Sequence, residues 1–172
     1  MQAIIRFYWQ LCRFRAGPEQ TPAASVFITI TLLAYCAVNL SVWTAVGDVD
    51  LLQGATNLIL MTSAWMVVVL LVLFFKGKIY RFRQTSAALL GADALISCAS
   101  LPVLLLAVSL NEASTAIGGI KVILLVVMVW DILVKGFIYH RSMGLSVFQG
   151  NLFSLSLTLG LMVLGQQLQK SL

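Results

Sequence analysis

Five long apolar runs, separated by short connectors, follow one another along this 172-residue chain. A transmembrane helix needs about 20 predominantly apolar residues to cross about 30 Å of hydrocarbon. Each run meets that length, and no connector is long enough to fold as a domain. The sequence therefore predicts an all-α polytopic membrane bundle with five transmembrane helices within residues 25–165. The runs are Ser25–Val46, Leu52–Phe75, Ser86–Leu110, Gly118–Tyr139 and Leu145–Gly165.

The composition excludes most other classes of protein. Hydrophobic residues make up 60% of the sequence and charged residues 10%, whereas soluble domains average about 45–50% and about 25%. A soluble globule of roughly this length buries only about 70% of the surface that its unfolded chain exposes. A soluble enzyme, a disordered chain and a disulfide-linked secreted domain are therefore not expected. Cys12, Cys36 and Cys98 form no CxxC pair, and with one histidine they predict no metal site.

Basic residues divide unequally between the two sets of connectors. One set, with the amino-terminal segment, is rich in Lys and Arg, whereas the other holds Lys170 and the acids Asp48, Asp50 and Glu112. Because basic residues accumulate on the cytoplasmic side, we expect a cytoplasmic amino terminus. A short tail, residues 166–172, should lie on the exported side. The basic set comprises Arg6, Arg13, Arg15, Lys76, Lys78, Arg81, Arg83 and Arg141.

Residues 1–16 have the pattern of an amphipathic helix in the membrane interface. At about 100° per residue, the polar side holds Gln2, Arg6, Gln10 and Arg13, and apolar residues cover the other side. Arginines interrupt the apolar run, so the segment is not a signal peptide. The groove of a partner protein is an alternative binding surface, but the tryptophan and tyrosine of the segment favour the membrane surface.

Four ionisable residues fall inside the predicted spans: Asp93, Lys121, Asp131 and Lys135. Lys121 lies near the exported-side end, where its long side chain can reach the interface and pair with Glu112. Asp93, Asp131 and Lys135 lie about 10, 12 and 6 Å inside the cytoplasmic boundary, at 1.5 Å per residue. Because unpaired charges at that depth are unfavourable, the sequence predicts an intramembrane cluster of these three residues.

Two interpretations of this cluster are open. Carboxylates of this kind serve proton or ion pathways in pumps and transporters. An ion-paired cluster that fixes the register of neighbouring helices, without a transport role, accounts for the same residues. We favour the structural interpretation, because one polar group is little evidence for a pathway.

Small residues recur on two of the predicted spans and indicate close helix packing. A spacing of three or four residues places them on one face, where they let helix backbones approach. Contacts within the bundle are the expected use, and contacts between copies of the chain are the alternative. The residues are Ala87, Gly91, Ala94 and Cys98 in the third span and Ser146, Gly150, Ser154 and Thr158 in the fifth.

Enzyme motifs are missing from the sequence. No HExxH, GxSxG, Walker or GxGxxG motif occurs, and His140 is expected to be a solvated loop residue. The sequence therefore predicts a non-enzymatic protein with no catalytic residue, cofactor or metal, unless a partner subunit or cofactor supplies the chemistry. The connector at 76–83, which alternates basic and aromatic residues, suits anionic lipid headgroups. Nucleic acid is not an expected partner.

The second half of the chain resembles a known family. The segment RFRQTSAALLG at 81–91 leads to SCASLP at 97–102, and a span containing VWDIL at 129–133 follows. These segments are similar to the Yip-domain family of five-span membrane proteins, whose third span carries a small-residue run that ends in a proline. The resemblance implies no catalytic residues. Eukaryotic members have long amino-terminal segments and associate with small GTPases in vesicle traffic, and this compact chain is more similar to bacterial members.

Together these features predict a scaffold, assembly factor or accessory subunit that acts through helix contacts within the membrane. Its expected partners are the lipid bilayer, anionic headgroups, and other membrane proteins or further copies of itself. The alternative is a small transporter or channel subunit with Asp93 and Asp131 on a proton or ion pathway. Because five spans with short loops enclose little space, such a transporter is expected to dimerise.

Overall fold

The computed structural model describes residues 2–22, 25–46, 51–110 and 115–171, which form helices and no β-strand. Five of the described helices are long and apolar enough to cross a membrane. These helices confirm the predicted all-α bundle of an integral membrane protein. The elements are α1 (Gln2–Cys12), η1 (Pro18–Gln20), α2 (Ser25–Val46), α3 (Leu51–Phe75), η2 (Ile79–Arg81), α4 (Phe82–Ser109), α5 (Thr115–Met143) and α6 (Val147–Ser171).

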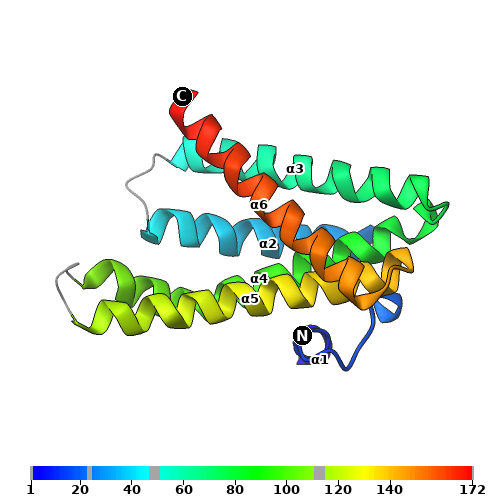
Figure 1. Ribbon diagram of the computed structural model, residues 1–172, viewed down its shortest axis with the longest axis horizontal. Coiled ribbons are helices and arrows are strands. Elements are labelled where there is room, and N and C mark those ends of the chain that lie inside the picture. The colour runs from blue at the N-terminus through cyan, green and yellow to red at the C-terminus, as the bar shows by residue number, and fades with distance from the viewer. Residues whose placement is uncertain (1, 23–24, 47–50, 111–114, 172) are drawn as a thin grey trace.

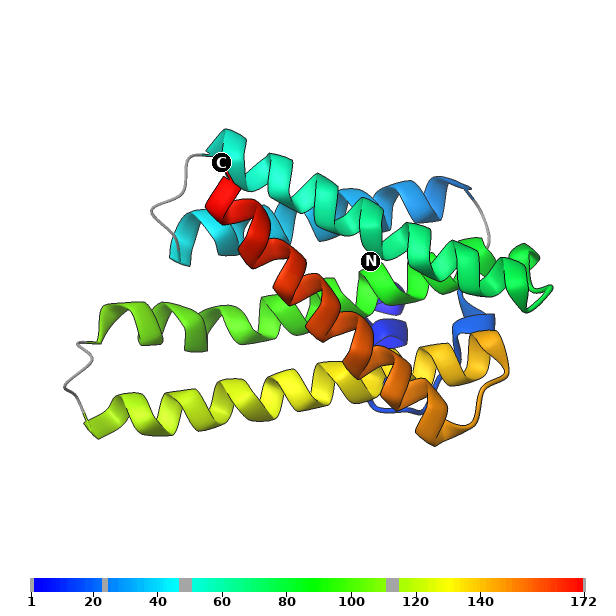
Figure 2. The same ribbon diagram turned by 45° about the horizontal axis from the view of Figure 1, so that its top comes forward.

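The long helices run back and forth along one direction, and α4 packs against both α2 and α5 (Figure 1). Helix α5 also packs against α6, while α3 contacts α2 and α6. Helix α6 crosses the other helices obliquely. The halves of the two helices where α4 ends and α5 begins, termed the far halves, stand apart from α2, α3 and α6 (Figure 2). The opposite end of the bundle, where η2 and the α5–α6 connection lie, is termed the basic end. It carries Lys76, Lys78, Arg81, Arg83 and Arg141.

Several helices extend beyond the predicted apolar runs. Helix α4 begins at Phe82 rather than Ser86, and α5 ends at Met143 rather than Tyr139. Helix α6 continues through Ser171, so residues 166–171 of the predicted tail are helical. Gln, Leu and Lys are good helix formers, so a polar end can continue the helix after the apolar run has stopped.

Local features build the connection from α5 to α6. Gly144 follows α5 with a φ of 67°, a left-handed conformation that glycine adopts without strain. Ser146 caps α6, because its Oγ accepts a hydrogen bond from the Gln149 amide at 3.1 Å. Ser146 is exposed, so its predicted packing role is wrong. His140 is not the solvated loop residue that we predicted: it lies half-buried in the last turn of α5, with Nδ1 against the Leu145 carbonyl oxygen.

Two glycines bring α5 and α6 into close contact. A Cβ on Gly136 would overlap Asn151, and one on Gly150 would overlap the Gly136 carbonyl oxygen. Only glycine allows the two backbones to approach this closely. Gly150 therefore occupies the packing position expected of it, with Gly136 as a partner that the small-residue pattern did not identify. Ser154, one turn further along α6, is buried.

The small residues of α4 accommodate α1 as well as neighbouring spans. Tyr8 on α1 donates a hydrogen bond from its hydroxyl to the Ala87 carbonyl oxygen at 3.0 Å. A Cβ on Gly91 would overlap the Tyr8 ring, so this glycine leaves the space that the ring fills. Ala94 packs against the buried core. Cys98 is exposed and lines a hollow with Ala34 and Val38 of α2, so it makes no close packing contact within the described bundle.

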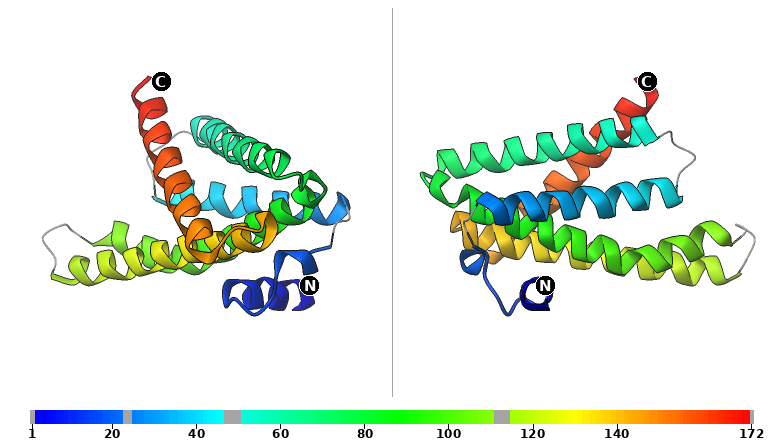
Figure 3. Two further views of the ribbon diagram at one scale, coloured as in Figure 1. Left: turned by 45° about the vertical axis from the view of Figure 1, so that its right-hand side comes forward. Right: turned by 180° about the vertical axis from the view of Figure 1, so that it is seen from behind.

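Helix α1 lies across the spans rather than along them (Figure 3). Leu11 and Cys12 are fully buried, and Trp130 on α5 donates from Nε1 to the Cys12 carbonyl oxygen at 3.0 Å. Ile5 and Trp9 remain exposed. The prediction that the whole apolar side contacts the membrane surface is therefore wrong for Leu11 and Cys12, which pack against the bundle instead.

Because α1 is docked on the bundle, we predict that the Cys12 thiol reacts slowly with alkylating reagents. Burial raises the pKa of the Cys12 thiol to about 12, and the carboxylates of Asp131 and Asp93 add to this shift. Because the thiolate is the reactive form, little of it exists near neutral pH. A chain with Cys12 as its only cysteine (Cys36→Ala, Cys98→Ala) should react slowly with N-ethylmaleimide at about pH 8, as measured by mass spectrometry of the folded protein.

Undocking α1 should release this protection. In the same background, Tyr8→Ala removes the ring that fills the space at Gly91 and should speed alkylation of Cys12 by about tenfold or more. Tyr80→Ala is the matched control, because Tyr80 is exposed at the basic end and should leave the rate unchanged. Equal rates for the two variants would contradict the docking of α1.

Candidate functional site

Three charged side chains meet inside the bundle, and they are the three that the sequence predicts to cluster. Lys135 Nζ lies 2.5 Å from Asp93 Oδ1 and 2.6 Å from Asp131 Oδ2. The side chains are 13–17% exposed, so solvent screens the ion pairs weakly. Asp93, Asp131 and Lys135 are termed the charged triad.

Two helices bring the charged triad together at mid-depth in the bundle. Asp131 and Lys135 are one turn apart on α5, and Asp93 reaches the same ammonium group from α4. Since α4 begins at Phe82 and α5 ends at Met143, both carboxylates lie about 17 Å from the basic end of their helices. These distances to the helix ends exceed the distances to the ends of the apolar runs, because both helices extend past those runs.

An aromatic ring lies against the ammonium group, and further polar aromatic residues lie next to it. Lys135 Nζ lies 5.0 Å from the centre of the Trp65 ring on α3, within the range of a cation–π contact. Trp65 donates from Nε1 to the Tyr139 hydroxyl at 2.7 Å, and Thr62 donates from Oγ1 to the Tyr35 hydroxyl at 3.3 Å. Sequence reasoning missed these residues, because an isolated aromatic residue in an apolar span gives no periodic signal.

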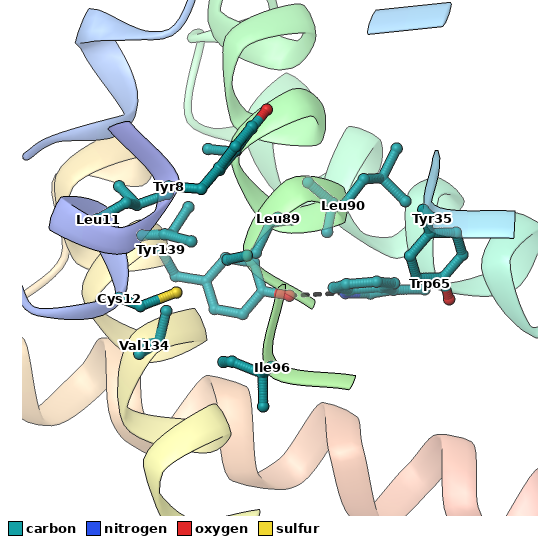
Figure 4. Close-up of a cluster of buried hydrophobic side chains, with 14 of the residues drawn as sticks. Tyr8, Leu11, Cys12, Tyr35, Trp65, Leu89, Leu90, Ile96, Val134 and Tyr139 are labelled. Atoms are coloured by element: carbon teal, nitrogen blue, oxygen red, sulfur yellow. Dashed lines mark hydrogen bonds between the residues drawn. The ribbon is translucent and has the colours of Figure 1, made fainter. Parts of the chain in front are cut away.

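Buried side chains close the triad off toward the basic end. Figure 4 shows Tyr139 pointing from α5 toward Trp65, with Leu89 from α4 close by and Leu11 and Cys12 from α1 behind it. Tyr139, Leu89, Leu11 and Cys12 have no exposed surface. Leu89 and Tyr139 each lie one turn closer to the basic end than Asp93 and Lys135, so their buried side chains cover the triad on that side.

A central cavity of about 160 Å³ reaches the triad, and all five long helices line it. Asp93 and Lys135 form its charged wall, and its remaining polar residues include Tyr35, Tyr139 and Thr158. Thr158, predicted to pack helices, thus lines a cavity. At about 30 Å³ per molecule, the volume corresponds to about five waters.

A second hollow, of about 250 Å³, is lined by α4 and α5 alone and is termed the α4–α5 hollow. Its polar residues are Asp93, Ser97, Ser100 and Asp131. Asp93, Ser97 and Ser100 repeat at helical spacing, so they form one polar stripe along α4. Asp93 lines both the central cavity and this hollow, and the triad therefore stands between two open spaces.

The triad holds one more acidic than basic group. A single ammonium serves both carboxylates, and Asp131 Oδ1 is buried with no hydrogen-bond partner among the described residues. Such a group can accept a hydrogen bond, pair with a second cation or take up a proton. Within the described part of the chain, no three His, Cys, Asp or Glu side chains are placed to hold a metal ion.

The other charged residues lie away from the triad. Arg141 Nη2 pairs with Glu19 Oε1 at 2.6 Å, and Arg81 donates from Nη1 to the Arg141 carbonyl oxygen at 3.4 Å. Lys121 is exposed on α5. The exposed basic residues also include Arg6, Arg13, Arg15, Lys76 and Arg83, whereas Lys78 is half-buried. Outside the described residues lie the predicted exported-side acids Asp48, Asp50 and Glu112.

Comparison with family models, with curated proteins and with solved structures gives no match to this chain. The resemblance to the Yip-domain family therefore stays a prediction. The charged triad, the central cavity and the α4–α5 hollow are the observations from which a function is inferred.

We predict that substituting the two lysines of α5 changes the free energy of unfolding by different amounts, because Lys135 belongs to the triad and Lys121 does not. Lys135→Met leaves two carboxylates facing each other without a cation, and it should lower the free energy of unfolding by about 3–5 kcal/mol. Lys121→Met, a matched change at an exposed site, should have little effect. Unfolding in mixed micelles of dodecyl maltoside and dodecyl sulfate, followed by tryptophan fluorescence, measures both.

A neutral triad provides the control for this comparison. Adding Asp93→Asn and Asp131→Asn to Lys135→Met removes the repulsion and should restore most of the lost stability. If Lys135→Met were as stable as Lys121→Met, the ion pairs would not hold α4 and α5 together.

Proposed function

We propose that this chain is a non-enzymatic membrane protein that serves as a scaffold, assembly factor or accessory subunit through helix contacts within the bilayer. The ion-paired triad carries the proposal. Lys135 holds a carboxylate of α4 and one of α5 at 2.5 and 2.6 Å, which fixes the register of the two helices. Because α4 and α5 keep one relative position, their joint surface has a defined shape that a partner protein can bind.

The lateral surface of the bundle supports this function. The far halves of α4 and α5 stand apart from the other spans (Figure 2), and many of their apolar side chains are exposed. Helices associate in lipid through packing and polar contacts rather than through the hydrophobic effect, so this two-helix projection suits association with another protein or a further copy. Its exposed apolar residues include Leu105, Leu106, Val122, Leu125 and Val126.

The basic end supports a defined place in the membrane. Exposed Lys76, Arg83 and Arg141 lie there, while α1 lies deeper along the bundle, where Trp9 contacts Trp130 of α5. Anionic headgroups attract such basic residues by about 1 kcal/mol each. The basic end accordingly faces the cytoplasm of a bacterial inner membrane.

A topology measurement tests this orientation. Alkaline phosphatase, which is active only after export, and green fluorescent protein, which fluoresces in the cytoplasm, are each fused to Leu172. We expect an active phosphatase and a dark fluorescent protein, because α6 ends opposite the basic end (Figure 1). Cytoplasmic fluorescence at Leu172 would contradict the orientation, and fusions at Lys78 should give the reverse pattern.

A second candidate function is a proton or ion pathway through Asp93. The central cavity favours this candidate, because all five spans line it and Asp93 and Lys135 form its wall. The fully buried side chains of Leu89 and Tyr139 speak for the first proposal, since they cover the triad on the side of the basic end.

Flux through reconstituted vesicles decides between the two functions. The purified chain in vesicles that enclose a pH-sensitive dye should conduct protons, Na⁺ and K⁺ no faster than protein-free vesicles, because the triad is closed toward the basic end. Asp93→Asn should change nothing. Flux in the wild-type chain that disappears in Asp93→Asn would overturn the scaffold function and select the pathway.

A further inference from the structure

We propose that the α4–α5 hollow binds a transmembrane helix of another protein through a lysine or arginine on that helix, which pairs with the charged triad. This inference rests on the proposed accessory function and names the chemistry of its partner. Three properties of the hollow carry it: its charge, its polar lining and its depth in the membrane.

The triad has two carboxylates and one ammonium group, so a second cation beside it would be stabilised. Asp93 and Asp131 both line the hollow, whereas Lys135 is a single ammonium already shared between them. The triad thus has one acid more than it has bases, and a carboxylate without a cation of its own in a medium of low dielectric constant is unfavourable unless it takes up a proton or a positive charge approaches it. A basic side chain on a neighbouring helix, entering through the hollow, supplies that charge.

The lining of the hollow fits a helix better than lipid. Ser97 and Ser100 extend the polar stripe of Asp93 along α4. Ser100 donates within the helix to the Ser97 carbonyl oxygen at 2.9 Å, and lipid chains offer no hydrogen bond to the Asp93 carboxylate. Small polar residues also let a second helix backbone approach closely and bond across the contact. The apolar residues Leu124 and Met128 of α5 supply packing for the remainder of the incoming helix.

The depth of the hollow argues against a second copy of this chain as the source of the cation. Lys135 is occupied by its own carboxylates. Lys121 lies on the same helix about 15 Å from Asp131, at 1.5 Å per residue over ten residues. A copy in the same orientation would therefore place Lys121 at the wrong level, and a different helix must carry the basic residue.

Designed single-span peptides test the inference on the full chain. Two leucine-rich peptides of equal length, one with a central lysine and one with leucine there, carry a dansyl acceptor for the native tryptophans. In phosphatidylcholine vesicles that hold the intact protein, the lysine peptide should bind about tenfold more tightly than the leucine peptide. Energy transfer as a function of peptide concentration gives both affinities.

Variants show whether binding follows the charge of the triad. Asp131→Asn and Asp93→Asn each leave one carboxylate paired with one ammonium. Each variant should therefore lower the affinity for the lysine peptide to that for the leucine peptide. Asp93→Asn combined with Lys135→Met leaves Asp131 as the single charge, so the lysine preference should return. Lys121→Gln, away from the hollow, should not change it.

The outcomes separate this inference from the proposed function. Equal affinity for the two peptides, or a lysine preference that survives the loss of both carboxylates, would overturn the helix site while leaving a scaffold that binds elsewhere. A lysine preference that disappears in both single variants and returns in the double variant supports it. Asp93-dependent flux would overturn the proposed function, whatever the peptides do.

Discussion

The contact of one ammonium group with two carboxylates determines how the rest of the bundle is arranged. Lys135 can approach Asp93 at 2.5 Å and Asp131 at 2.6 Å only if α4 and α5 lie side by side in one register. In a medium that cannot solvate charge, separating these groups costs far more than any single apolar contact contributes. The apolar surfaces of the two helices, which are interchangeable in lipid, thereby acquire a unique alignment.

The same contact explains why aromatic residues from other helices gather at this depth. The face of the Trp65 ring stabilises the Lys135 ammonium, and its indole nitrogen bonds the Tyr139 hydroxyl at 2.7 Å. These two interactions connect α3 to α5. A polar centre on two helices thus positions a third, as expected where lipid removes the hydrophobic drive for helix association.

The sequence predicts the fold and the triad but not the surroundings of the triad. Long apolar runs define spans because the bilayer fixes their length, and rare charges such as Asp93 and Lys135 must find each other. Trp65 and Tyr139 carry no such requirement, so their contact depends on which faces the helices present. Tyr8 is a similar case: amphipathicity predicts an apolar side for α1, yet the space at Gly91 that receives its ring exists only after α4 has folded.

Lys121 and Lys135 show how depth and surroundings divide one residue type between two roles. Both lie on α5, but Lys121 is exposed near one end, where a flexible stem carries its charge toward the interface. Lys135 is turned into the bundle, where its side chain is 13% exposed and is held by its two carboxylates. Because its one ammonium group is shared between the Asp93 and Asp131 carboxylates, Lys135 cannot fully neutralise them. The residue that makes the α4–α5 pair stable therefore leaves one carboxylate without a cation of its own beside an open hollow, and this carboxylate gives the lateral surface its selectivity for a basic partner helix.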